Sequence, residues 1–142
     1  CYACLSKFVH KIPMPTRAKA ASRPAPEEAR RAVLSKAVVR AAGLLGVTQK
    51  QVAQTIGVSD ATASRMFGGK YLLDPDCKEW ELASLFVRLF RSLDSIVGSD
   101  EKARQWLRSE NLALGERPLD LLPKAEGLIR VLHYLDAARG RI

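Results

Sequence analysis

The side chains best suited to binding another molecule lie between Gln49 and Lys70, where small polar and basic groups alternate with apolar ones. An arginine can pair in a bidentate manner with guanine, and serine or threonine can contact a base edge or a thymine methyl group. Glutamine and lysine can hold the phosphates that fix the protein on the duplex. These residue types indicate a DNA-binding surface. The predicted DNA-contacting residues are Gln49, Lys50, Ser59, Asp60, Thr62, Ser64, Arg65 and Lys70.

The same stretch contains the signals for two short helices and a tight turn. Thr48 and Gln51 are spaced as a capping box, which starts the first helix. Ala53 is small enough for two helices to cross closely, and Gly57 favours the left-handed conformation that ends a helix. Ser59 can cap the second helix. The pattern predicts a helix-turn-helix whose second helix enters the major groove with its N-terminal end. The alternative is an ordinary helical hairpin in an all-α core.

The segments before this motif predict a leader and a supporting helix. Pro26, followed by two glutamates, favours a helix start. An apolar stripe then runs to Gly46 through Leu34, Val38, Ala41 and Leu45. Residues 1–25 are expected to be a disordered basic arm that contacts DNA or is simply solvated, because residues 15–26 are poor in large apolar groups. Residues 1–13 are more apolar, and Met14 is a plausible alternative start.

The second half of the chain predicts three further helices. Residues 77–97 form an apolar stripe that is wider than one small neighbour would cover, which favours a homodimer seam over a two-sided core helix. The predicted seam residues are Trp80, Phe86 and Phe90. Ser99 caps a shorter helix with Ala103, Trp106 and Leu107 facing inward, and a loop with a short helical turn follows. The last helix begins near residue 125.

Composition supports an all-α DNA-binding protein of two parts. Residues 1–73 contain 12 Lys/Arg and 3 Asp/Glu, whereas residues 74–142 contain 11 and 12, so the net charge of +8 resides in the half with the helix-turn-helix. We expect residues 26–73 to form the DNA-binding domain and residues 74–142 a helical partner-binding and dimerisation domain. No apolar run is long enough for a membrane span, so a cytoplasmic protein is expected.

The sequence contains little that indicates an enzyme. There is no glycine-rich phosphate loop, and His10 and His133 have no evident triad or metal setting. Cys1 and Cys4 lack a fourth metal ligand in any familiar spacing, and three cysteines do not suggest a disulfide framework. We therefore predict no catalytic residues, no metal and no cofactor.

Two parts of the chain resemble a known family. Residues 30–70 resemble the helix-turn-helix of phage repressors and Xre-type regulators. The second half carries an ordered set of residues similar to the C-terminal toxin-binding domain of the Xre/MbcA/ParS antitoxins: Ala103, Trp106, Leu107, Asn111, Leu114, Gly115, Pro118, Leu119, Leu121, Leu122, Gly127, Val131, Leu135 and Gly140. The two resemblances together cover residues 30–142.

The resemblance implies a type II antitoxin whose partner is a RES-domain toxin, a class linked to NAD depletion. Such an antitoxin blocks the toxin's active site, forms a hetero-oligomer with it, and represses its own operon by binding operator DNA. The last helix and its tail are expected to reach the toxin cleft through Tyr134, Arg139, Arg141 and the carboxylate of Ile142, which would stand in for a phosphate. The alternative is a stand-alone transcriptional regulator whose second half only dimerises.

Overall fold

The computed structural model describes residues 26–140, which form seven α-helices and no β-strand. The all-α prediction is confirmed. The predicted leader, residues 1–25, lies outside the described residues, as do Arg141 and Ile142. The helices are α2 (Pro26–Leu45), α3 (Gln49–Ile56), α4 (Asp60–Phe67), α5 (Lys78–Val97), α6 (Asp100–Arg108), α7 (Pro118–Leu121) and α8 (Ala125–Arg139).

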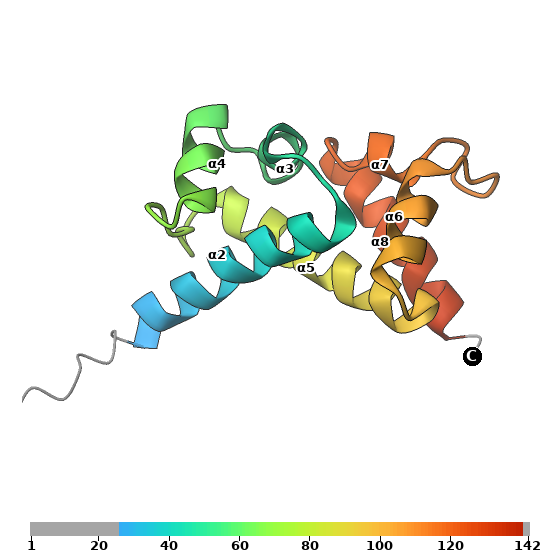
Figure 1. Cartoon of the computed structure of the whole chain (residues 1–142), viewed down its shortest axis with the longest axis horizontal. Helices are drawn as coiled ribbons and strands as arrows, with labels where there is room; N and C mark the ends of the chain where they lie inside the picture. Colours follow the sequence, from blue (N-terminus) through green and yellow to red (C-terminus); the bar gives the residue numbers. More distant parts are fainter. Residues whose placement is uncertain (1–25, 141–142) are drawn as a thin grey trace, which may run out of the picture.

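The long helix α5 connects the two ends of the molecule. Figure 1 shows α3 and α4 at one end, α6, α7 and α8 at the other, and α5 extending between them. α5 packs against α2 and α3 as well as against α6 and α8. Its side chains Phe86, Leu89 and Leu93 are completely buried and belong to the single apolar core that includes residues of both halves. Removal of this apolar surface from water is the main favourable term that holds the ends together.

The supporting helix α2 follows its predicted stripe. Val38, Ala41 and Leu45 are buried, and Leu34 is half-buried at the edge of the core. The helix also has apolar side chains away from this stripe, since Val33 is 68% exposed. A helix that is apolar on more than one side is usually covered on more than one side.

Two arginines of α6 bind the C-terminal end of α2. Arg104 Nε donates a hydrogen bond to the Leu44 carbonyl oxygen at 2.7 Å, and Arg108 Nη2 donates to the Gly46 carbonyl at 2.7 Å. The last carbonyls of a helix have no partner within the helix and carry partial negative charge, so guanidinium groups satisfy them well. This contact joins the second half of the chain directly to the helix that supports the DNA-binding motif.

Within residues 26–140, no helix combines the length and the apolar character that a membrane crossing requires.

Candidate nucleic-acid interface and partner-binding domain

The first helix of the motif starts and ends as predicted. The Gln51 N–H donates to Thr48 Oγ1 at 3.2 Å, and the Thr48 N–H donates to Gln51 Oε1 at 2.9 Å, which completes the capping box. Gly57 has φ of 79°, a left-handed conformation that would be strained for other residues. The N–H groups of Gly57 and Val58 both donate to the Ala53 carbonyl, and Ala53 itself is buried. The turn between α3 and α4 is therefore held by the backbone.

The N-terminal turn of α4 organises three of the predicted DNA-contacting side chains. Ser59 caps the helix by accepting from the Thr62 N–H at 3.1 Å, and its hydroxyl donates to Thr62 Oγ1 at 2.9 Å. Arg65 Nη2 donates to the same Thr62 oxygen at 3.4 Å. Ser59, Thr62 and Arg65 thus lie along one edge of α4. Because the Ser59 hydroxyl is already engaged in the cap, its most direct role is to start the helix.

The remaining candidate residues lie at exposed positions. Ser64 and Arg65 are exposed, whereas Thr62 is half-buried. Ala63 and Met66 supply the buried side of the same helix. The other exposed candidates are Gln49, Lys50, Asp60 and Lys70.

Two basic residues of α2 that sequence reasoning missed lie next to the end of α4. Lys36 and Arg40 line a hollow of about 430 Å³ together with Phe67, Gly69 and Tyr71. The signal that could have identified them is their spacing of four residues on a helix, which places two cations on one side. The sequence does not show that this side of α2 lies next to the end of α4.

The segment that follows α4 is fastened to α2. Arg31 Nε donates to the Leu73 carbonyl at 2.8 Å, and the Leu73 N–H donates to Ser35 Oγ at 2.9 Å. The Tyr71 hydroxyl donates a hydrogen bond to Glu79 Oε1 at 2.5 Å. Burial, together with this bond and the charge of the carboxylate, raises the pKa of Tyr71 to about 12.

A loop built on Asn111 shapes the opposite end of the molecule. Asn111 Oδ1 accepts from the Ala113 N–H at 2.9 Å, and the Asn111 carbonyl accepts from the Gly115 N–H at 2.8 Å. Arg130 Nη2 of α8 donates to the Leu114 carbonyl at 2.9 Å. These bonds hold the loop against the last helix, which explains why an asparagine is needed at the loop's start.

α7 and α8 approach each other at a glycine. A Cβ atom built on Gly127 would lie 2.1 Å from the Leu121 carbonyl oxygen and 2.9 Å from the Leu121 carbonyl carbon. Only a residue without a side chain fits there. Asn111 and Gly127 both belong to the series of residues that resembles the toxin-binding domain. The structure gives a reason for each: Asn111 holds the loop, and Gly127 allows α7 and α8 to approach.

Two family models match the chain. Residues 24–88 match the antitoxin Xre-like helix-turn-helix domain, and residues 92–141 match the antitoxin Xre/MbcA/ParS C-terminal toxin-binding domain. The chain belongs to the Xre/MbcA/ParS antitoxin family. A search of curated proteins gives no match. The antitoxin is therefore a binding protein with a DNA-binding and a toxin-binding domain, and it is not an enzyme.

Two of the antitoxin's predicted toxin-contacting residues lie on α8. Tyr134 stacks on Trp106 of α6, with ring centroids 6.0 Å apart and an angle of 18° between the rings. Both aromatic side chains are half-buried, so the pair has an accessible side. Arg139 is exposed, and its Nη1 donates to Ser92 Oγ at 3.3 Å. The other two predicted residues, Arg141 and Ile142, are outside the described range.

The predicted dimer seam of the antitoxin divides into buried and accessible parts. Phe86 is completely buried in the chain's own core, so it has no surface to offer a second copy. Trp80 and Phe90 are half-buried at the edge of that core. The seam remains a prediction, and the accessible surface it needs can come only from Trp80, Phe90 and their neighbours.

Proposed function

We propose that this antitoxin belongs to a type II system, that it neutralises a RES-domain toxin by covering the toxin's active site, and that it represses its own operon. The observation that carries the proposal is the presence of both family domains in one chain, joined through a shared core helix. The RES partner is supported by the resemblance of the second half, from Trp106 to Gly140. The proteins would act in the cytoplasm, as a homodimer that associates further with toxin.

The division of labour proposed here follows the two predicted segments. Residues 26–73 carry the DNA-facing helix α4, and residues 74–142 carry α6, α7 and α8. In the first segment, Arg65 and Ser64 are proposed to meet base edges, and Lys50 and Lys70 to hold phosphates. Lys36 and Arg40 are added to the proposed phosphate contacts, because they line the same hollow as Phe67 at the end of the recognition helix.

Toxin contact is assigned to the exposed end of α8. The stacked pair of Tyr134 and Trp106 offers a rigid aromatic surface, and aromatic side chains are frequent anchors of protein interfaces. Arg139 lies five residues further along α8, and its guanidinium donates a hydrogen bond to Ser92. These two positions are the accessible part of the predicted toxin-binding group.

The test is co-expression of the full antitoxin with the product of the adjacent gene, with growth and co-purification as readouts. Tyr134→Ala combined with Arg139→Ala should abolish rescue and the complex. Arg65→Ala should keep both, because it lies on α4, and should weaken only operator binding. If the unsubstituted antitoxin neither rescues growth nor forms a complex, the result would favour the alternative hypothesis of a stand-alone transcriptional regulator.

A further inference from the structure

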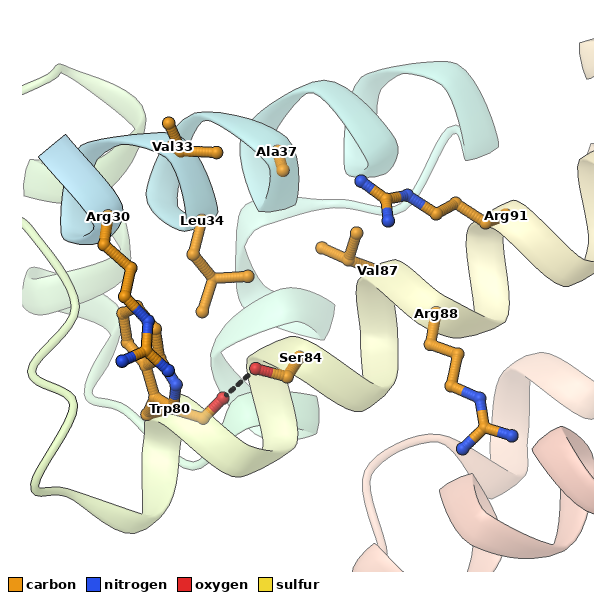
Figure 2. A pocket seen from close by; sticks show the side chains of 9 residues that line it. All are labelled: Arg30, Val33, Leu34, Ala37, Trp80, Ser84, Val87, Arg88 and Arg91. Atoms are coloured by element: carbon orange, nitrogen blue, oxygen red, sulfur yellow. Dashed lines mark hydrogen bonds between the residues drawn. The ribbon is translucent and has the colours of Figure 1, made fainter.

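A groove with a basic rim lies between α2 and α5, and Trp80 of the predicted dimer seam is one of its lining residues. It has a volume of about 460 Å³, with Leu34, Ala37 and Val87 forming its apolar floor. Figure 2 shows Arg30 stacked over Trp80 at one end and Arg91 extending toward α2 at the other. Val33, 68% exposed, stands on the α2 rim. The groove therefore combines an exposed apolar centre with cationic ends.

The apolar surface continues from this groove across α5 to α8. Trp80 and Ser84 also line a second hollow of about 430 Å³, whose other walls include Leu85 and Ile129. Ile129 is 39% exposed. Val33 and Ile129 are two of the three exposed large apolar side chains in residues 26–140, and each of them lines a hollow together with Trp80. Exposed apolar side chains gathered on one side of a protein are candidates for an interaction site.

The charges on the groove specify what can cover it. Arg91 forms no ion pair within residues 26–140, whereas Arg88 is paired with Asp136 at 2.6 Å. A molecule that covers the groove would remove water from the Arg91 guanidinium, which is costly for an unpaired cation. We therefore expect the occupant to place a carboxylate at the Arg91 end. Residues 1–25 cannot supply it, because they contain five Lys/Arg and no Asp/Glu.

The chain itself carries a suitable carboxylate on the same helix. Glu27 lies on the side of α2 that includes Arg30, Leu34 and Ala37, since these positions follow one another at spacings of three and four. It is exposed and forms no ion pair among the described residues. Glu27 precedes Val33 by six residues, or about 9 Å of helix. An equal step beyond Val33 ends two residues past Ala37, and Figure 2 shows the Arg91 guanidinium on the far side of Ala37 from Val33.

We propose that a second copy of the chain occupies the groove, with the two α2 helices antiparallel about a two-fold axis near Val33. Val33 of each copy then packs against Leu34 and Trp80 of the other, and Glu27 of each copy faces Arg91 of the other. Every contact occurs twice because the interface is isologous. This arrangement gives the homodimer of the proposed function a specific surface, and it rests on that proposal only for the expectation of a dimer.

The apolar part of the interface is tested by sedimentation velocity on the full chain at up to about 100 µM. The unsubstituted protein should have twice the chain mass of 15.6 kDa. Val33→Asp should raise the dimer dissociation constant about 100-fold, because it places a charge at the centre of the contact. Leu112→Asp is the matched control: Leu112 is 100% exposed on the loop before α7, so the dimer should be unchanged. Far-UV circular dichroism should confirm that both variants are folded.

The charge pairing is tested by a swap. Glu27→Arg and Arg91→Glu should each raise the dissociation constant about tenfold, and the double variant should return it close to the original value. Glu28→Arg is the control, since it changes the same charge in the same turn but lies on a different side of α2.

Three results would overturn the inference: a monomeric unsubstituted chain, a Val33→Asp variant as dimeric as the original, or a double variant no better than the single ones. A chain that dimerises as described but fails to neutralise toxin would instead remove the proposed function and leave this interface intact.

Discussion

Arg65 is the residue on which we propose that base recognition by α4 depends. Its guanidinium is exposed and lies beside Thr62 on the helix that we propose enters the major groove. Arg65→Ala should reduce discrimination at one operator base pair by roughly 1–3 kcal/mol, whereas Lys50→Ala should weaken binding to all sequences alike. Binding assays on operator variants distinguish the two. An equal loss on every sequence for Arg65→Ala would demote Arg65 to a phosphate contact.

Gly127 is the residue least tolerant of a side chain. Alanine at this position would place Cβ 2.1 Å from a backbone oxygen of Leu121, so α7 and α8 would have to separate. We expect Gly127→Ala to lower the free energy of unfolding by about 3 kcal/mol, which urea denaturation can measure. Gly43→Ala is the control: it also lies within a helix, but nothing surrounds its Cβ position within 4 Å. That change should stabilise the protein by about 0.5–1 kcal/mol. Similar values for both variants would contradict the packing argument.

Tyr71 should make stability depend on pH in the alkaline range. Its pKa is raised from 10.0 to about 12 in the folded protein, so the folded state holds its proton more tightly than the unfolded state does. The free energy contributed by the protonated hydroxyl is fully present below pH 10 and is lost as the pH rises toward about 12. Absorbance titration of the tyrosinates should show one late transition that Tyr71→Phe removes. A transition unchanged in Tyr71→Phe would assign it to another tyrosine.

At the scale of elements, α6 is important because it binds the end of α2. Arg108→Ala removes the bond to the Gly46 carbonyl and a longer one of 3.4 Å to the Leu45 carbonyl. Because these bonds are partly exposed, we expect a loss of about 1 kcal/mol in unfolding free energy. Arg117→Ala breaks only the exposed pair with Asp120 and should cost about 0.5 kcal/mol or less. Thermal or urea unfolding of both variants provides the comparison, and equal losses would argue against a capping role for α6.

At the scale of the whole molecule, α5 makes the two halves depend on each other for folding. Phe86 and Leu89 of α5 are completely buried in a core that α2 and α3 share, so a fragment of residues 26–73 would expose that core to water. We expect the fragment to lack a cooperative unfolding transition, while the full chain has one. Circular dichroism during heating tests this. A cooperatively folding fragment would contradict this expectation and establish residues 26–73 as an independent domain. DNA binding could then be studied on that fragment as well as with point substitutions in the full chain.

The sequence by itself determined the helices and the motif, because their signals are local. A capping box at Thr48, a left-handed glycine at position 57 and an apolar stripe along α5 each act within a few residues, and all three were predicted correctly. The order of residues from Trp106 to Gly140 likewise identified the toxin-binding domain, now matched by its family model.

Only the tertiary structure decided which side of each helix has a neighbour. Trp80 and Phe86 look equally available on the apolar stripe of α5, yet one is half-buried beside Arg30 and the other is wholly enclosed. The position of Lys36 and Arg40 beside α4, and the bonds from Arg104 and Arg108 to the end of α2, were equally absent from the local pattern. These contacts join residues far apart in the chain, and helical periodicity specifies which side of a helix is apolar but not what covers it.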